Sequence, residues 1–192
     1  MNKKYTPSYF IKWIALIIGL SIIVGVVYHV RIYEPVVCAA EGISDYDPAR
    51  DRQRIIDMFN ADHYWLTVNT DYDIGHMLDT HSPNRFEPRY FGAMPIKVIR
   101  EEGRVVAWCA YYMRTMYQGM ILFMDVHAEA RQKGYARKLA QFAECDLRRK
   151  GAHKVTLATR VANKAAQVAY ERMNYTNMGI SDGFVHYEKK LR

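Results

Sequence analysis

The chain has 192 residues, of which 50% are hydrophobic, and its 27 Lys and Arg against 20 Asp and Glu give a formal net charge of +7. This length is enough for one domain with an appendage, and the hydrophobic content is enough to bury a core. Residues 1–34 carry +3 of the charge, and the mild excess of +4 in the rest does not require nucleic acid as a partner, so none is expected.

The N-terminal segment contains an apolar stretch long enough to cross a bilayer. About 22 residues, from Tyr9 to Val30, make roughly 33 Å of helix, against a hydrocarbon core of about 30 Å. Lys12 lies near one end of this stretch, where its amine can extend to the headgroups. Residues 1–33 are therefore expected to be a membrane anchor, with a single transmembrane helix over about residues 10–30.

A cleaved signal peptide is the alternative for this segment. Its apolar region would span about 7–15 residues, with a small-residue cleavage site close behind. The available site, Val37-Cys38-Ala39, lies about ten residues beyond the apolar stretch and after Arg31, Glu34 and Pro35. The uncleaved anchor is therefore favoured.

Residues 34–50 are expected to be a linker, because Pro35, Gly42 and Pro48 interrupt any periodic pattern, although residues 42–46 could supply a short strand. Beyond the linker, apolar residues at helical spacing predict an amphipathic helix over residues 51–65. A second short helix is predicted over residues 73–80, ended by the loop that contains Pro83 and Pro88.

The rest of the chain alternates between strands and helices. Strands are predicted over residues 96–100, 105–114, 120–126, 154–160 and 184–191. Two amphipathic helices are predicted, one from about residue 136 until Gly151 stops it and one from Asn163. The order helix, helix, three antiparallel strands, helix, strand, helix, strand predicts an α/β fold with a mixed, mainly antiparallel central sheet flanked by helices on both faces.

The stretch between the third strand and the following helix combines small and basic residues. Arg131-x-x-Gly134-x-Ala136 resembles the pyrophosphate-binding turn of the GNAT superfamily of N-acetyltransferases, whose signature is Arg/Gln-x-x-Gly-x-Gly/Ala. A small, flexible turn at a helix start directs unpaired backbone N–H groups at one point, and the helix dipole adds positive potential there. Gly134 and Ala136 allow a diphosphate to approach the backbone closely, while Arg131 and Lys133 add full charge.

A second match lies in the last predicted helix. Asn163, Ala166, Tyr170 and Tyr175 match the motif Asn-x-x-Ala-x-x-x-Tyr-x-x-x-Gly-Phe of the same superfamily. Asn174 stands where the family usually has Gly, and Asn is the next-best residue for the left-handed conformation that ends a helix. The two motifs and their spacing extend the resemblance over roughly the last three quarters of the chain.

The resemblance implies an acyl-CoA N-acyltransferase-like domain over residues 51–192. Its activity would be the transfer of an acetyl group from acetyl-CoA to an amine, by direct attack in a ternary complex; the amine acceptor, a small molecule or a protein, is left open. In the family the fourth strand splays from the fifth, and its backbone pairs with the pantetheine arm. The residues that this implies at the acetyl-CoA site are Met124, Val126, Arg131, Gln132, Lys133, Gly134, Tyr135, Ala136 and Asn163.

Acetyl transfer needs a neutral amine, stabilisation of the oxyanion and a proton for the departing thiolate. Tyr170 matches the residue that many relatives use as the general acid, although a core tyrosine is the structural alternative. Some relatives carry a glutamate early in the fourth strand; that place is occupied here by Met120 or nearby Ile121 and Leu122, and none of these can take a proton. Asp125, at the strand end, is the tentative general base, and a chain of water molecules is the alternative. Asn163 either contacts the pantetheine or caps its helix, and both roles are compatible.

The three cysteines, Cys38, Cys109 and Cys145, have no metal-ligand spacing and cannot all pair. Cys109 in an apolar strand and Cys145 in a helix are expected to be buried free thiols. No metal is expected. A non-catalytic acyl-CoA-binding or interaction module of the same fold is the alternative function: the missing strand carboxylate favours it, while Tyr170 and Arg131 argue against it.

Membrane orientation gives two conflicting expectations. Three lysines precede the apolar stretch and only Arg31 follows it closely, which places the N-terminus in the cytoplasm and the domain outside. Acetyl-CoA is a cytoplasmic metabolite, and this places the domain inside. On cofactor grounds we expect a single-pass membrane protein that contacts the lipid bilayer through its N-terminal helix and has a cytoplasmic catalytic domain.

Overall fold

The computed structural model describes residues 37–83 and 92–191. The predicted anchor, residues 1–33, lies outside the described residues. Within the part that is described, no helix combines the length and the apolar character needed to cross a membrane.

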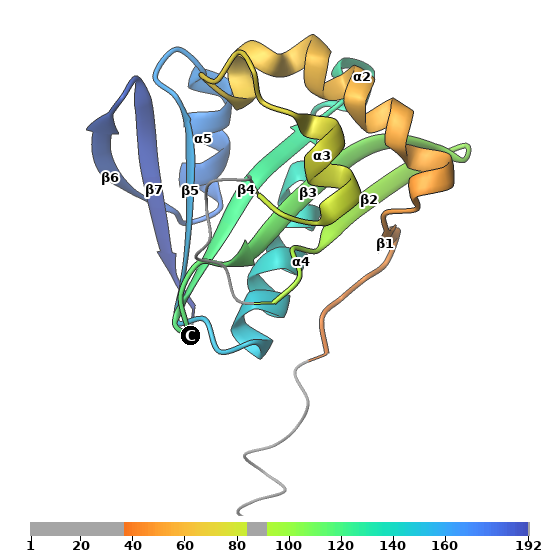
Figure 1. Cartoon of the computed structure of the whole chain (residues 1–192). Helices are drawn as coiled ribbons and strands as arrows, with labels where there is room; N and C mark the ends of the chain where they lie inside the picture. The colour runs from red at the N-terminus through yellow and green to blue at the C-terminus, as the bar shows by residue number, and fades with distance from the viewer. Residues whose placement is uncertain (1–36, 84–91, 192) are drawn as a thin grey trace, which may run out of the picture. The chain divides into compact units, whose positions relative to one another are not determined.

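A sheet of seven strands forms the centre of the described domain (Figure 1). The strands are β1 (Ile43–Asp45), β2 (Ile96–Glu101), β3 (Arg104–Met113), β4 (Gln118–Val126), β5 (Lys154–Arg160), β6 (Thr176–Ser181) and β7 (Phe184–Lys190). They lie in the order β1-β2-β3-β4-β5-β7-β6. All neighbours are antiparallel except β4 and β5, which run parallel. The predicted mixed, mainly antiparallel sheet is confirmed, and so is the short strand before residue 46.

Helices cover both faces of this sheet, as predicted (Figure 1). They are α2 (Pro48–Leu66), α3 (Ile74–Thr80), α4 (Tyr135–Arg149) and α5 (Lys164–Arg172). α2 and α3 lie on one face, where Phe59 is buried with Trp108 in one hydrophobic cluster. α4 and α5 contribute to a second cluster, in which Leu139 and Tyr170 are buried.

The first of these helices begins three residues earlier than predicted. Pro48 stands at its first turn, and the side chain of Asp47 accepts a hydrogen bond from the N–H of Ala49. Proline suits this position because its fixed φ matches the helix and its missing N–H is not needed there. Pro48, which the sequence pattern places in the linker, therefore starts a helix.

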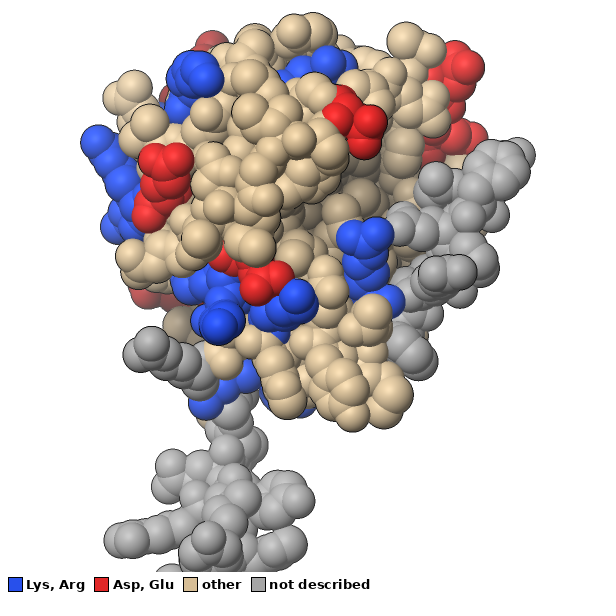
Figure 2. Space-filling view, turned by 90° about the vertical axis from the view of Figure 1, so that its left-hand side faces the viewer, with Lys and Arg blue, Asp and Glu red and all other residues tan. Residues whose placement is uncertain are grey.

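The edge strand β6 was not predicted. All six of its residues are exposed, and Met178 and Ile180 are among the exposed large hydrophobic side chains. Because neither face of the strand is buried, its sequence lacks the alternation of polar and apolar residues that marks a half-buried strand. Figure 2 shows the side of the molecule on which β6 and β7 lie, with charged groups scattered over a largely uncharged surface.

One of the two expectations for buried thiols is wrong. Cys145 is not free but forms a disulfide with Cys38, with the two Cα atoms 5.6 Å apart and a sequence separation of 107. Cys109 is free and buried, as predicted. No local spacing could indicate the pair, since one partner precedes β1 and the other lies in α4.

Candidate active site

The parallel strands β4 and β5 lie side by side only where they begin. They pair from Gln118 with Lys154 to Met120 with Thr156. Past this point the register of β4 against β3 shifts: Tyr111 lies opposite Ile121 and Ala110 lies opposite Phe123, so that Leu122 is an extra residue. Such a bulge bends a strand and increases its twist. The predicted splaying of the fourth strand from the fifth is therefore confirmed.

The backbone beyond the bulge is directed into the gap between the two strands. The N–H of His127 donates to the carbonyl of Val106 on the β3 side, at 2.9 Å. Because successive residues of a strand direct their N–H and C=O groups to alternate sides, those of Met124 and Val126 point to the β5 side. These are the two strand residues that the family resemblance maps onto the pantetheine arm.

A cavity of about 960 Å³ fills this gap. It extends from the C-terminal turn of α2, through β4 and β5, to the start of α4 and the length of α5. Its volume is at the upper end of the range of roughly 300–1,000 Å³ for ligand sites. Among its lining residues are Asp125, Asn163 and Tyr170, so the cavity brings together both sequence motifs and the tentative base.

The turn that precedes α4 has the conformation of an anion-binding turn. Gln132 and Gly134 have positive φ angles of 66° and 85°, and Gly134 is the residue at the helix N-cap. A Cβ atom added to Gly134 would meet no other atom within 4 Å, so the space in front of the turn is open. The first N–H groups of α4 have no partner within the helix and are available to a ligand. The predicted pyrophosphate turn therefore has both the shape and the space for a diphosphate.

The basic side chains of this turn are already paired. Arg131 donates from Nε to the carbonyl of Val126 at 3.0 Å and forms an ion pair with Asp62 of α2 at 2.5 Å. Lys133 donates to the Glu101 carboxylate at 2.9 Å and 3.0 Å. The backbone N–H groups are thus the main donors that remain for an anion.

These two acidic partners were missed in the sequence. Asp62 lies 69 residues from Arg131, and Glu101 lies 32 residues from Lys133. Glu101 also accepts a hydrogen bond from the hydroxyl of Tyr135. Only the tertiary fold, which brings α2 and the end of β2 next to the turn before α4, places these groups together.

Tyr170 lines the cavity and belongs to one of the two hydrophobic clusters. It is 8% exposed, and its ring centroid is 5.6 Å from that of Tyr187 and 6.0 Å from that of Tyr175. Burial raises the pKa of the Tyr170 phenol, because the phenolate would lose its hydration. Tyr170 is therefore protonated at neutral pH and has the state required of a proton donor.

Asn163 starts α5 as predicted. Its side-chain oxygen accepts a hydrogen bond from the N–H of Ala166 at 3.1 Å. The helix ends where Asn174 takes a left-handed conformation, with a φ of 64°. The capping role of Asn163 is confirmed, and both ends of this motif have the expected backbone geometry.

Asp125 is buried beneath α2 at the end of β4. It is 6% exposed, lies opposite Trp108 of β3 and adjoins the carboxyl group of Asp62. Burial and the neighbouring Asp62 carboxylate raise the pKa of Asp125 to about 7, and Arg131 opposes this rise. A carboxyl group with this pKa can take up a proton near neutral pH. Met120 offers no such group: its sulfur accepts a hydrogen bond from the Tyr112 hydroxyl at 3.3 Å.

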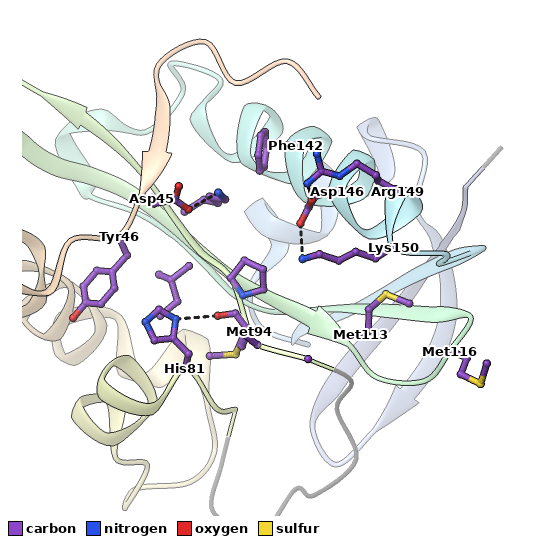
Figure 3. Close-up of a pocket in the computed structure, with 15 residues that line it drawn as sticks. Asp45, Tyr46, His81, Met94, Met113, Met116, Phe142, Asp146, Arg149 and Lys150 are labelled. Carbon is purple, nitrogen blue, oxygen red and sulfur yellow. Dashed lines mark hydrogen bonds and ion pairs between the residues drawn. The ribbon is translucent and has the colours of Figure 1, made fainter. Parts of the chain in front are cut away.

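A second cavity, of about 860 Å³, lies between β1, the start of β2 and the C-terminal half of α4 (Figure 3). Lys150 and Arg149 point at Asp146 and form ion pairs with it, both at 2.7 Å. Lys97 is paired with Asp45 at 2.5 Å. The cations of this cavity are paired with acidic neighbours, as Arg131 and Lys133 are in the gap between β4 and β5, but its lining does not include the turn at Gly134 with its open backbone N–H groups.

Among the described residues, no three His, Cys, Asp or Glu side chains are grouped to hold a metal ion.

Comparison with known proteins supports the assignment that the geometry suggests. The family model of the acetyltransferase (GNAT) family matches residues 51–175. A search of curated proteins gave no match.

Solved structures share the fold. The ribosomal-protein-alanine N-acetyltransferase from Brucella melitensis aligns with a TM-score of 0.60 at 17% identity, over 78% of this chain and 99% of that one. YncA from Salmonella typhimurium, a putative acetyltransferase solved with its cofactor acetyl-CoA, aligns with a TM-score of 0.59 at 19% identity, over 78% and 93%. Ard1 from Thermoplasma volcanium gives 0.61 at 16% identity, over 78% and 97%.

At these identities the structural likeness establishes the fold, and the family model establishes the family. The splayed strands, the turn before α4 and the two motifs are all within the domain that these comparisons cover. The chain belongs to the acetyltransferase (GNAT) family and is an acetyltransferase.

Proposed function

We propose that this acetyltransferase transfers an acetyl group from acetyl-CoA to an amine, by direct attack in a ternary complex. The observation that carries the proposal is the continuous cavity between β4 and β5, which joins the turn at Gly134 to Tyr170. Acetyl-CoA bound to a neighbour of the same fold supports the same donor for this chain.

The donor would be held mainly by backbone groups. The turn from Arg131 to Ala136 faces open space and would receive the diphosphate on its N–H groups, at the positive end of the α4 dipole. Met124 and Val126 direct backbone groups into the gap and would pair with the pantetheine arm as an additional strand does. Asn163 lies at the opposite wall and would add a side-chain contact.

Tyr170 would act as the general acid and Asp125 as the general base. The amine nitrogen forms a C–N bond with the thioester carbon as the C–S bond breaks, and the departing thiolate takes the phenolic proton of Tyr170. The proton that the amine loses passes through water to Asp125, and Asp125 then returns a proton through water to the Tyr170 phenolate, so that both groups regain their starting states. Each step of this kind typically contributes about 100- to 10,000-fold to a rate.

A non-catalytic acyl-CoA-binding module is the second candidate, and Met120 favours it because an apolar side chain stands where some relatives carry a glutamate. The two candidates differ in one measurement. The full-length chain in detergent is incubated with acetyl-CoA and a panel of amines: a peptide with a free N-terminus, a lysine peptide, a polyamine and an amino sugar. Mass spectrometry then shows either an acetylated acceptor or no product.

We also propose that residues 1–33 anchor the chain in a membrane by one helix. The need for acetyl-CoA favours a cytoplasmic domain. The Cys38–Cys145 disulfide favours the other side, since such bonds persist mainly in oxidising compartments. The charge distribution around the apolar stretch agrees with the disulfide. Protease protection in sealed vesicles distinguishes the two orientations.

A further inference from the structure

Four side chains link the buried end of β4 to the surface turn before α4. Asp125 is buried against Trp108 and adjoins Asp62, whose side chain is 20% exposed. Asp62 forms the ion pair with Arg131, and Arg131 also donates to the carbonyl of Val126. The oxygen Oδ2 of Asp125 is buried and makes no hydrogen bond to any described residue.

We propose that Asp62 is a positioning residue for the acyl-CoA turn: it holds Arg131 in place, and its contact with Asp125 makes the charge beside the turn, and therefore the affinity for CoA, depend on pH. This rests on the proposed function, because it takes the turn from Arg131 to Ala136 to be the diphosphate site. The positioning part follows from the two contacts of Arg131, which fix its guanidinium to both α2 and the end of β4.

The charge of the group follows from its members. The charged groups that act on Asp125 are Asp62 from α2 and Arg131 from the turn, while β3 contributes the uncharged indole of Trp108. His127 and Glu129 follow β4 and lie 3.9 Å from each other. With Asp125 protonated, Asp62 and Arg131 cancel. With Asp125 ionised, the group carries a net negative charge.

This negative charge opposes a diphosphate. Burial and the Asp62 carboxylate raise the pKa of Asp125 to about 7, so the extra charge develops as the pH rises through neutrality. A like charge roughly 10 Å from an anion weakens its binding by about three- to tenfold at an effective dielectric constant near 20 with partial screening by salt. CoA is therefore expected to bind less tightly at pH 8 than at pH 6.

The test measures CoA affinity by calorimetry from pH 5.5 to 8.5, with the full-length chain in detergent and no amine present. The 3′-phosphate of CoA itself titrates near pH 6, at about the second pKa of a phosphate monoester. Each protein is therefore titrated with CoA and with dephospho-CoA, which lacks that group. The slope that remains with dephospho-CoA belongs to the protein.

Asp125→Asn is the main variant, because the amide mimics the protonated acid in size and charge. It should abolish the protein's slope and leave the affinity at pH 8 about three- to tenfold tighter than that of the wild type. Asp62→Asn removes a carboxylate that raises the pKa of Asp125, so the pH at which affinity changes should move downward. It should also loosen the turn, seen as faster hydrogen exchange of its amides. Asp57→Asn, on the same helix and bonded to Gln53 instead, is the matched control and should match the wild type.

Equal slopes in the wild type and in Asp125→Asn would overturn the proposal. If Asp125→Asn does not fold, an unchanged midpoint in Asp62→Asn would overturn it equally. A wild-type chain that binds no CoA at any pH is a different result: it refutes the proposed function and is distinguished from a failure of this inference by the absence of any affinity to compare.

Discussion

Cys38 and Cys145 form a disulfide that ties the segment leading into β1 to the C-terminal half of α4. The bond joins parts of the chain that are separated by 107 residues and encloses most of the domain. A cross-link of this span restricts the unfolded chain much more than the folded one, so it stabilises the domain.

Replacing both cysteines by serine should therefore lower the free energy of unfolding by about 2–5 kcal/mol. Urea unfolding of the full-length chain measures this. A reductant should lower the stability of the wild type by a similar amount and leave the double variant unchanged. Three cysteines that react with a thiol reagent in the denatured, unreduced wild type would contradict the bond; one reactive cysteine, Cys109, is expected.

Gly134→Asp should abolish or greatly weaken CoA binding. The substitution places a Cβ and a negative charge in the open space before α4 and strains a φ of 85°. Gly183→Asp is the matched control, since Gly183 also has a positive φ of 78° with nothing within 4 Å but lies in the β6–β7 turn. Calorimetry should show weaker CoA binding by Gly134→Asp than by Gly183→Asp. Equal affinities of the two variants for CoA would show that the diphosphate does not bind at this turn.

Tyr170→Phe should lower turnover by about 100- to 10,000-fold while changing CoA affinity little, because the hydroxyl is needed only when the thiolate leaves. Tyr187→Phe serves as its control. Tyr187 is a neighbouring buried tyrosine whose hydroxyl bonds to Glu171 at 3.2 Å, so its loss should affect stability and not turnover. Turnover is measured where chemistry limits the rate. An undiminished rate in Tyr170→Phe would make that residue a packing residue.

Asp125 should make the domain less stable as the pH rises from about 4 to about 7. Its pKa in the folded state is raised to about 7, above the value of about 3.9 for an unfolded chain. Stability from the protonated acid is therefore complete below the unfolded pKa and is lost as the pH rises through the folded one. The free energy of unfolding, measured in urea across this pH range, should change less with pH in Asp125→Asn than in the wild type. Parallel pH profiles of the two proteins would contradict a raised pKa of Asp125.

The first 33 residues should hold the chain in membranes through carbonate extraction, since about 20 apolar residues exceed what a peripheral contact supplies. Gly19→Asp should impair insertion by about 2.5–3.5 kcal/mol. Val37→Asp, beyond the apolar stretch and 86% exposed, is the control.

Two measurements then decide the remaining alternatives for this segment. A mature N-terminus near Ala40 would show a cleaved signal peptide, and an intact start would support the anchor. Protease treatment of sealed right-side-out vesicles should leave a cytoplasmic domain protected. A digested domain would instead indicate that the domain lies outside, the orientation that the disulfide and the charge distribution favour.

Those parts of the fold that follow a local pattern could be predicted. The apolar stripe of α4 and the Asn163 cap of α5 depend on residues three or four apart, and the structure has both. β6 could not be predicted, because an exposed edge strand has no buried side to impose a period. The sequence pattern does not show the helix start at Pro48, since proline both interrupts periodic patterns and occupies the first turn of helices.

The candidate site also contains features that a local sequence pattern predicts and features that depend on tertiary packing. The turn at Gly134 and the cap at Asn163 are local features with recognisable motifs. The ion pair between Asp62 and Arg131 depends on how α2 packs across the end of β4. The sequence pattern of α2 or of the turn before α4 alone does not predict this contact. The sequence therefore predicted where acyl-CoA would bind but not which acidic groups control the basic side chains there.

The most direct test of the central claim is release of free thiol from acetyl-CoA by the full-length chain, measured with and without an amine acceptor. We expect thiol release that depends on the amine, yields an equal amount of acetylated amine, and is lost in Tyr170→Phe and in Gly134→Asp. Tight CoA binding with no thiol release for any amine in the panel would contradict it and leave a binding module of the same fold.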